Sequence, residues 1–263
     1  MKETAKLVLP NSFEQGSLAI SANTIAVGWT GFNFDQGEIY LYTRPADGWR
    51  NGLQPAAILT ASDGQPDDFL GVSSSFYGDT LVAAAANVGA YVFVKPPGGW
   101  TTGTQTAKLT ESGGTGSDGF GSSIAIYGGT IVVGAPDTGT RRIPDYGTAY
   151  LYYEPSSGWT DATQNAEIRA SDFGSMNYFA GAVAVTGSLV AVGASGDANG
   201  GAGAAYVFKG AHQTAELTPV DGMEGEGMGY TIAASGNTVV AGAVNAALGA
   251  NSDQGALYVF APH

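Results

Sequence analysis

The chain has 263 residues, which is enough for one large domain or two small ones. Hydrophobic residues make up 44% and charged residues 13%, and the 41 glycines follow no collagen repeat, a composition that favours a real core built from short strands and tight turns. The net charge of −13 argues against a nucleic acid or an anionic membrane as partner, because phosphate groups are bound by clusters of Lys and Arg. No cysteine is present, which excludes disulfides, thiolate metal sites and a cysteine nucleophile.

The chain opens with MKETAKLVLP, which has no apolar segment of the kind found in a signal peptide, so we expect none. No later run approaches the ~18 apolar residues of a membrane-spanning helix, and we expect no membrane insertion. The same ten residues hold Ala5-Lys6-Leu7, a short pattern of Ala, any residue, and Leu or Ile. This pattern returns four times, at 57–59, 107–109, 166–168 and 215–217.

Three other strand patterns recur between the copies of the Ala-x-Leu/Ile pattern, always in the same order. The first is a short segment that follows each opening loop, at 17–20, 73–76, 123–126, 182–185 and 231–234. The second is a continuously apolar run, which suits a strand buried on both faces, at 24–28, 80–84, 130–134, 189–193 and 238–242. The third is a tyrosine, an apolar residue and an aromatic residue, an alternation typical of a strand with one face inward, at 40–42, 91–93, 150–152, 206–208 and 258–260.

Five copies of each of four strand patterns predict an all-β protein, a five-bladed β-propeller with four antiparallel strands in each blade. The last repeat has no fourth strand after its tyrosine pattern, whereas Ala5-Lys6-Leu7 stands alone before the first repeat. We therefore expect the N-terminal strand to join the last blade and close the ring. The single domain, 1–263, would divide into blades at about 11–62, 63–112, 113–171, 172–220, and 221–263 plus 1–10.

The third repeat carries Phe120-Gly121 at its start and Gly134-Ala135-Pro136 after its second strand. Weaker forms of these two pieces occur in the other repeats, among them Leu70-Gly71, Phe179-Ala180, Met228-Gly229, Gly28-Trp29, Gly193-Ala194 and Gly242-Ala243. Over essentially its whole length the chain resembles the FG-GAP repeat family of β-propellers, which includes the integrin α head. The resemblance implies a propeller fold, an extracellular or cell-surface location and non-catalytic binding. We interpret the small residues of both pieces as structural, because they let backbones approach near a crowded axis.

Calcium-binding members of this family carry an Asp-x-Asp-x-Asp-Gly loop between the first two strands of a blade. Here these connections are short turns such as Tyr127-Gly128-Gly129-Thr130, so we expect no metal site and no cofactor. The loops that lead into the blades are acidic and include Asp63, Asp68 and Asp118. They predict a negatively charged face, which we interpret as solvated loop charge because none has the spacing of a Ca²⁺ loop.

Three acidic residues, Asp35, Asp145 and Asp253, occupy equivalent positions just before the third strand of a repeat, and each is followed two positions later by glycine. The repeat would aim them toward one face, where they could bind a cation or the hydroxyl groups of a sugar. An Asx turn that opens the strand is the interpretation we favour.

Three tryptophans, Trp49, Trp100 and Trp159, recur in Gly-Trp pairs between the third and fourth strands. Propeller topology places this connection on the face opposite to the acidic loops. At repeated positions the indole rings could stack on sugar rings at two or three sites. A hydrophobic plug beneath each blade is the alternative that we favour.

Two loops depart from the repeat pattern. The first repeat has aromatic residues where the other repeats have small ones, namely Trp29, Phe32 and Phe34. They either cover the mouth of an axial channel or form a ligand platform. The loop 137–146 is the longest of its kind, and its candidate partner contacts are Arg141, Arg142 and Tyr146.

Catalysis has little support, because the two histidines, His212 and His263, have no serine and carboxylate pattern near them. We predict a non-enzymatic, monomeric ligand-binding propeller, with carbohydrate recognition at repeated sites as the leading function. Aromatic-rich loops without basic clusters suit sugars, and repeated sites raise weak affinities. A protein–protein adhesion or scaffold module is the alternative, and a hydrolase that uses the acidic face is a remote third.

Overall fold

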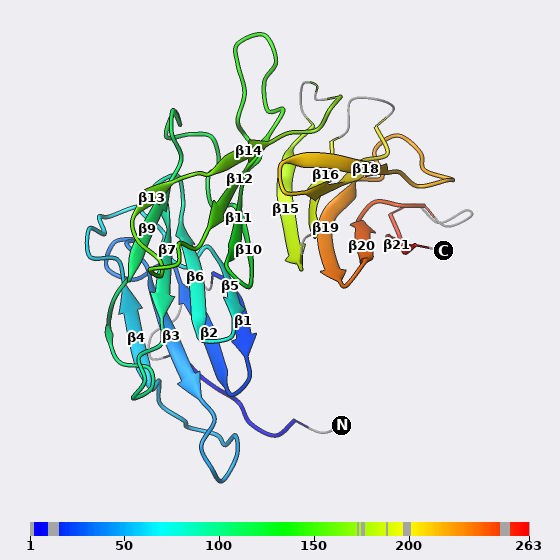
Figure 1. The fold of residues 1–263 in the computed structure, drawn as a ribbon. Coiled ribbons are helices and arrows are strands. Elements are labelled where there is room, and N and C mark those ends of the chain that lie inside the picture. Colours follow the sequence, from blue (N-terminus) through cyan, green and yellow to red (C-terminus); the bar gives the residue numbers. More distant parts are fainter. Residues whose placement is uncertain are drawn as a thin grey trace.

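A computed structural model describes residues 3–9, 16–172, 174, 177–187, 189–196, 201–247 and 253–262. The described chain is all-β, which confirms the predicted class, and its strands form five sheets of three to five strands. Figure 1 shows these sheets following one another in chain order. Within the described ranges, no helix is long and apolar enough to span a membrane.

The sheets follow the predicted repeats. The first contains β1 (Leu18–Ser21), β2 (Thr24–Trp29), β3 (Glu38–Thr43) and β4 (Ala57–Thr60), with β8 (Gly103–Thr104) at its edge. The second contains β5 (Ser73–Tyr77), β6 (Thr80–Ala85), β7 (Gly89–Val94) and β9 (Ala107–Thr110), with β13 (Ala162–Thr163) at its edge. The third contains β10 (Ser123–Tyr127), β11 (Thr130–Ala135), β12 (Thr148–Tyr153) and β14 (Ala166–Ile168). The fourth contains β15 (Phe179–Thr186), β16 (Leu189–Ala194), β17 (Ala204–Lys209) and β18 (His212–Leu217), and the fifth contains β19 (Met228–Ser235), β20 (Thr238–Ala243) and β21 (Ala256–Phe260).

The hairpin between β10 and β11 illustrates why each repeat folds locally. Tyr127 pairs with Thr130, which leaves Gly128 and Gly129 as a two-residue turn. Gly128 has a φ of +58°, a conformation that a two-residue hairpin needs and that glycine adopts without strain. The strand that follows the turn is buried along almost its whole length, as expected for a continuously apolar strand in the middle of its sheet.

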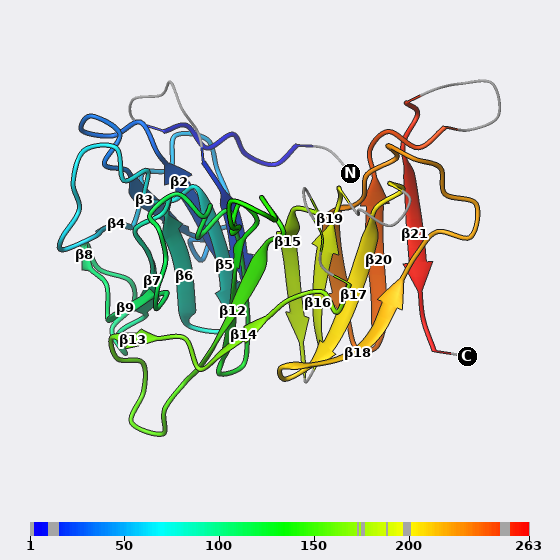
Figure 2. The same ribbon diagram turned by 90° about the horizontal axis from the view of Figure 1, so that it is seen from above.

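Consecutive sheets meet through their first strands, which lie side by side on the inner side of an arc (Figures 1 and 2). A Cβ added to Gly28 would lie 2.2 Å from the carbonyl oxygen of Gly71, and one added to Gly134 would lie 2.1 Å from that of Ala180. The glycine that ends a second strand therefore packs against the small residue that begins the next sheet. This contact explains the two recurring small-residue pieces as backbone packing between sheets.

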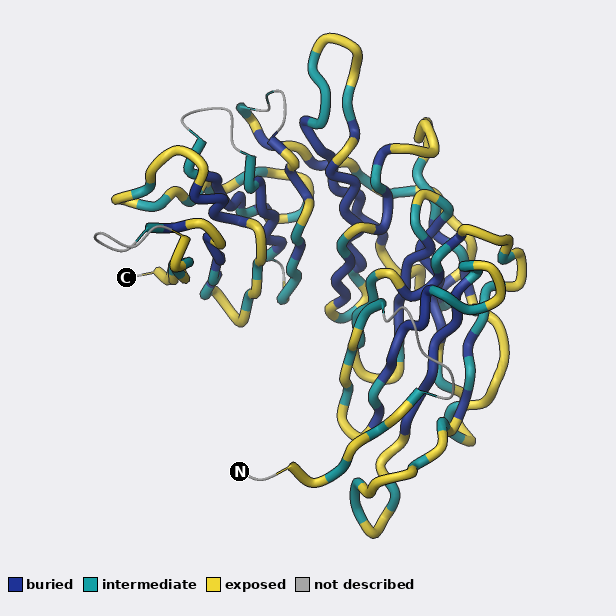
Figure 3. Tube along the Cα trace, turned by 180° about the vertical axis from the view of Figure 1, so that it is seen from behind, coloured by how far each residue is buried: buried dark blue, intermediate teal, exposed yellow. Residues whose placement is uncertain are grey.

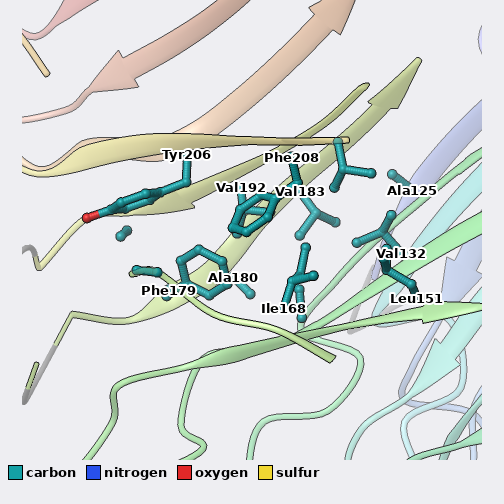
Figure 4. Packing of buried hydrophobic residues seen from close by; sticks show 14 of the residues in the cluster. Ala125, Val132, Leu151, Ile168, Phe179, Ala180, Val183, Val192, Tyr206 and Phe208 are labelled. Carbon is teal, nitrogen blue, oxygen red and sulfur yellow. The ribbon is translucent and has the colours of Figure 1, made fainter. Parts of the chain in front are cut away.

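Buried residues lie along the strands, and exposed residues gather in the connections (Figure 3). Figure 4 shows the cluster between the third and fourth sheets, which includes Val132 and Leu151 of the third sheet and Phe179 and Phe208 of the fourth. The Phe179 ring contacts Tyr206 and Phe208 edge to face, with centroid distances of 5.7 and 5.9 Å. In the first four sheets the aromatic residues of the Tyr-x-aromatic pattern are thus core residues. The prediction of a single inward face was wrong for β3, β7 and β12, because Leu41, Val92 and Leu151 between the aromatic residues are fully buried as well.

The predicted closing strand is not seen among the described residues. The fifth sheet has three strands, and residues 3–9 have no strand assignment. They lie along the first sheet instead, where Leu7 and Leu9 pack against the cluster around Tyr42, and the Tyr42 hydroxyl donates to the carbonyl oxygen of Val8 at 3.2 Å. The sheets therefore form a propeller-like arc whose first and last members lie at opposite ends (Figure 1).

Candidate ligand-binding site

A groove of about 310 Å³ runs between the first and second sheets, and Trp100 lies in its wall. The first sheet contributes the β1–β2 turn and the end of β3, and the second contributes the β5–β6 turn and the segment after β7. The polar lining residues from these elements are Ser21, Asn23, Thr24, Thr43, Asp79 and Lys95. The groove thus combines an aromatic wall with several hydrogen-bonding groups, which is the usual make-up of a small-molecule site.

The wall of the groove is positioned by packing. Trp100 contacts Phe76 edge to face with a centroid distance of 5.9 Å, and its partly buried ring packs on the core between the first two sheets. Gly99, which precedes it, donates its N–H to the carbonyl oxygen of Pro96 at 2.9 Å and so closes a tight turn. The indole ring is consequently held in place before any ligand arrives.

The polar side of the groove is built on the β5–β6 turn. Lys95 and Asp79 form an ion pair with a separation of 2.5 Å between Nζ and Oδ1, and the Lys95 N–H donates to the Asp79 carbonyl oxygen. Ser21 donates to the carbonyl oxygen of Gly78 at 2.9 Å, which joins the turns of the two sheets. The pair offers a fixed donor and a fixed acceptor beside Trp100. Sequence reasoning did not identify Asp79 or Lys95 as site residues, although Asp79 is the one carboxylate among the turns between first and second strands.

The other two tryptophans of the repeat are placed differently. Trp159 is buried in the cluster between the second and third sheets, as a hydrophobic plug would be. Trp49 is partly buried and packs against the cluster around Tyr42. The three equivalent sequence positions therefore differ in exposure, and it is Trp100 that lines the groove.

The repeated acidic residues before the third strand serve the contact between sheets. Asp35, Asp145 and Asp253 have φ values of +63°, +51° and +56°. The carbonyl oxygens of Asp35 and Asp145 accept N–H groups of the following sheet, those of Phe69 at 2.7 Å and Tyr178 at 3.0 Å. All three positions thus have a left-handed backbone, and the Asx turn that we favour from the sequence stays a prediction.

The aromatic loop of the first repeat divides into a buried and an exposed part. Trp29 is buried and stacks on Tyr40 at 5.9 Å, and Phe32 packs against Trp29 at 5.5 Å. Phe34, in contrast, is 82% exposed and has a φ of +59°. The N–H group of Asp67 donates to its carbonyl oxygen at 3.0 Å, so the loop presents Phe34 from a fixed backbone.

The loop 137–146 projects beyond the sheets, with an exposed tip (Figure 3). Arg141 and Arg142 lie exposed at this tip, whereas Tyr146 is buried and lies 5.2 Å from the guanidinium of Arg169. Burial, together with the charges of Asp145 and Asp118, raises the pKa of Asp137. The arginines are accessible to a partner, and Tyr146 belongs to the core.

Two of the acidic loop residues expected to be solvated are buried. Asp68 accepts the N–H of Gln65 at 2.7 Å, and Asp118 accepts the N–H of Thr115 at 2.9 Å. Each carboxylate closes a turn of four residues, a role that sequence spacing could have suggested. In the part of the chain that the structure describes, no group of three or more His, Cys, Asp or Glu side chains could hold a metal ion.

Asp63 forms the best-defined ionic network on the acidic face. It accepts the Tyr91 hydroxyl at 2.9 Å and pairs with Lys108 at 2.6 Å, and the Lys108 ammonium lies 5.3 Å from the Tyr91 ring centroid. Partial burial opposes ionisation, but the hydrogen bonds from Lys108 and Tyr91 outweigh it and lower the pKa of Asp63. Burial, and then the bond to Asp63, raise the pKa of Tyr91.

This network predicts a pH-dependent contribution to stability. Because the pKa of Asp63 is lower in the folded chain, its contribution is present above the ordinary value of about 4 and is lost as the pH falls through the folded value. We expect Asp63→Asn to reduce the melting temperature at neutral pH and to match the parent protein near pH 2.5. The effect should stay below about 1 kcal/mol because the pair is partly exposed. Asp47→Asn, at an exposed pair with Arg50, is the control, and an equal loss at both sites would contradict the assignment.

The fold defines a class of protein, an all-β repeat protein with propeller-like sheets. The FG-GAP repeat matches the chain at residues 103–152, 162–208 and 212–260, which is more than half of its length. The chain therefore belongs to the FG-GAP repeat family, as its Phe-Gly and Gly-Ala-Pro pieces suggest. FG-GAP repeats are typical of extracellular and surface proteins and of modules that bind ligands or other proteins, generally without catalysis.

No curated protein sequence matches the chain. Among solved structures, that of the computationally designed Ika4 protein is similar, with a TM-score of 0.46 at 14% sequence identity. The match covers 77% of this chain and 96% of that one.

Proposed function

We propose that this protein is a non-enzymatic binding module that takes a carbohydrate into the Trp100 groove. The observation that carries the proposal is the partly exposed indole of Trp100 beside the ion pair of Asp79 and Lys95. The apolar face of a sugar ring packs on an aromatic face, and its hydroxyl groups can donate to a carboxylate and accept from an ammonium. The groove volume of about 310 Å³ is at the lower end of small-molecule sites, which favours a terminal sugar as ligand.

The test is a glycan array probed with the parent protein, with Trp100→Ala and with Tyr153→Ala. Tyr153 is an exposed aromatic residue at the end of β12 and does not line the groove, so its replacement controls for a general loss of aromatic surface. We expect Trp100→Ala to weaken binding at least about tenfold, which corresponds to roughly 1.4 kcal/mol, and Tyr153→Ala to leave it unchanged. The proposal fails if no glycan binds the parent protein, or if both variants bind equally.

A protein partner is the second candidate function, and the exposed ring of Phe34 favours it. A phenylalanine that is 82% exposed on a hydrogen-bonded backbone is suited to act as an anchor in a partner's pocket. Arg141 and Arg142 offer further contacts on the projecting loop. An adhesion or scaffold module of this kind would lose its partner on Phe34→Ala, would keep it on Trp100→Ala, and would ignore free sugars.

A further inference from the structure

The two ends of the arc expose apolar side chains whose equivalents in other repeats are buried. On the first sheet, Leu18 and Ile20 of β1 are 64% and 68% exposed. The equivalent residues of β10, Ile124 and Ile126, are buried between the second and third sheets. The first sheet therefore has the face that normally packs on a preceding sheet, and no sheet formed by the described residues covers that face.

The last sheet exposes apolar side chains on the face that normally packs on a following sheet. Leu257 and Val259 of β21 are 72% and 66% exposed, whereas the equivalent residues of β12, Ala149 and Leu151, are fully buried in the cluster between the third and fourth sheets. An apolar groove of about 480 Å³ runs beside β21, and Val239 and Val259 contribute to its lining. The edge of β21 is thus open for one more strand.

Residues 3–9 already lie as the outer strand of a sheet that would precede the first one. The Lys6 N–H donates to Asn51 Oδ1 at 2.7 Å, just as the Lys108 N–H of β9 donates to Asp161 Oδ1 of the next sheet at 2.7 Å. The Tyr42 hydroxyl donates to the carbonyl oxygen of Val8, just as that of Tyr152 donates to Thr110. The N-terminal segment therefore makes the contacts of a fourth strand with the sheet that follows it.

Charge complementarity points to the same pairing. The Tyr258 hydroxyl lies 3.5 Å from Asp221 Oδ1, which is the counterpart of the bond from Tyr91 to Asp63. In the second sheet, Lys108 completes this group with its ion pair to Asp63. Lys6 is the counterpart of Lys108, because both are the middle residue of an Ala-Lys-Leu sequence, and Lys6 is exposed.

We propose that the last sheet of one copy takes up the first sheet and residues 3–9 of a second copy, head to tail. The register follows from the second sheet, in which Ala107, Lys108 and Leu109 pair with Val92, Tyr91 and Ala90. In the new contact Ala5 pairs with Val259, Lys6 with Tyr258, and Leu7 with Leu257. Addition of a strand to an open edge supplies backbone hydrogen bonds, and the apolar faces supply side-chain packing.

A second copy fits this contact better than the chain's own opposite end. The first and last sheets lie at opposite ends of the arc, and no strand pairing joins them among the described residues (Figures 1 and 2). To bring them together, the sheets would have to rotate at boundaries where backbone packs on backbone, as at Gly28 and Gly71. A second copy needs no such rotation, and the two surfaces differ, so the contact is heterologous.

The experiment uses two blocked variants, Leu18→Asp with Ile20→Asp, and Leu257→Asp with Val259→Asp. All four side chains are mostly exposed, so each variant should fold. In sedimentation velocity we expect the parent protein to associate as its concentration rises, and each variant alone to remain monomeric. An equimolar mixture should form dimers and no larger species, because each variant keeps one intact surface.

Lys6→Glu and Asp221→Lys refine the test. Each substitution alone should raise the dissociation constant of self-association at least about tenfold, and the double variant should recover most of the loss. A parent protein that stays monomeric at all concentrations, as expected from the sequence, would overturn the proposal. The proposal would also be overturned if both blocked variants were less stable than a monomeric parent protein and formed no dimers in the mixture. That result would mean that the ring closes within one chain.

Discussion

Gly147→Ala is expected to lower the free energy of unfolding by about 2–5 kcal/mol, a large part of the 5–15 kcal/mol typical of a domain. Gly147 precedes β12 with a φ of +77°, and an added Cβ would lie 1.9 Å from the carbonyl oxygen of Phe179 in the next sheet. A left-handed φ costs an alanine about 1–2 kcal/mol, and an overpacked contact about 1–3 kcal/mol or more. The atoms on both sides belong to the backbone, so no side chain can turn away.

Gly158→Ala is the matched control. Gly158 has a φ of +88°, but a Cβ added there would have no atom within 4 Å. The control therefore carries the conformational cost of about 1–2 kcal/mol without the clash. Urea denaturation followed by circular dichroism measures both, and equal losses at the two glycines would show that the packing between sheets has no energetic role.

Phe179→Ala is expected to cost about 3–5 kcal/mol, the usual range for truncation of a buried phenylalanine. The Phe179 side chain is completely buried and lies between Tyr206 and Phe208 in the cluster that joins the third and fourth sheets (Figure 4). Its removal leaves a cavity among residues held by their own sheets, which restricts collapse. We expect a lower urea midpoint and earlier proteolysis between the third and fourth sheets.

The neighbouring residue provides the control for this prediction. Tyr178 also has a left-handed backbone, with a φ of +49°, but its side chain is 39% exposed. Tyr178→Ala should cost less than about 1 kcal/mol, because a partly exposed ring gives up little buried area. If the two variants have the same urea midpoint, the phenylalanine of the repeat is not a core residue and the proposed packing is wrong.

The strands of each repeat could be predicted because their signals are local. Continuous apolar runs such as 130–134 and the two-residue turn at Gly128 specify strand and hairpin without reference to the rest of the chain. The left-handed backbone at Asp35, Asp145 and Asp253, in contrast, is a finding of the structure, because the sequence predicted only a turn there. Family membership followed from the same local pieces.

The angle between sheets and the exposure of individual side chains could not be predicted in this way. The position of Ala5-Lys6-Leu7 depends on how far the arc turns over five sheets, which is a sum of small packing differences at each boundary. The difference in exposure between Trp100 and the buried Trp159 depends on the turns that lie beside them. Asp79 and Lys95 form an ion pair in one repeat, whereas Gly129 and Glu154 occupy the equivalent positions in the next.

The short edge strands β8 and β13 make the first two boundaries between sheets stiffer than the later ones. Each crosses to the outer strand of the preceding sheet, where Gly103 pairs with Leu59 and Ala162 pairs with Leu109. The first two boundaries are therefore fastened both at the inner strands and at the rim. The connection between β17 and β18 is a tight turn at Gly210, so it supplies no such strap to the third boundary. Among the described residues no such strap joins the fourth and fifth sheets either. A force that pulls the two ends apart would load the first three sheets as one stiff body and concentrate its strain at the two boundaries of the fourth sheet.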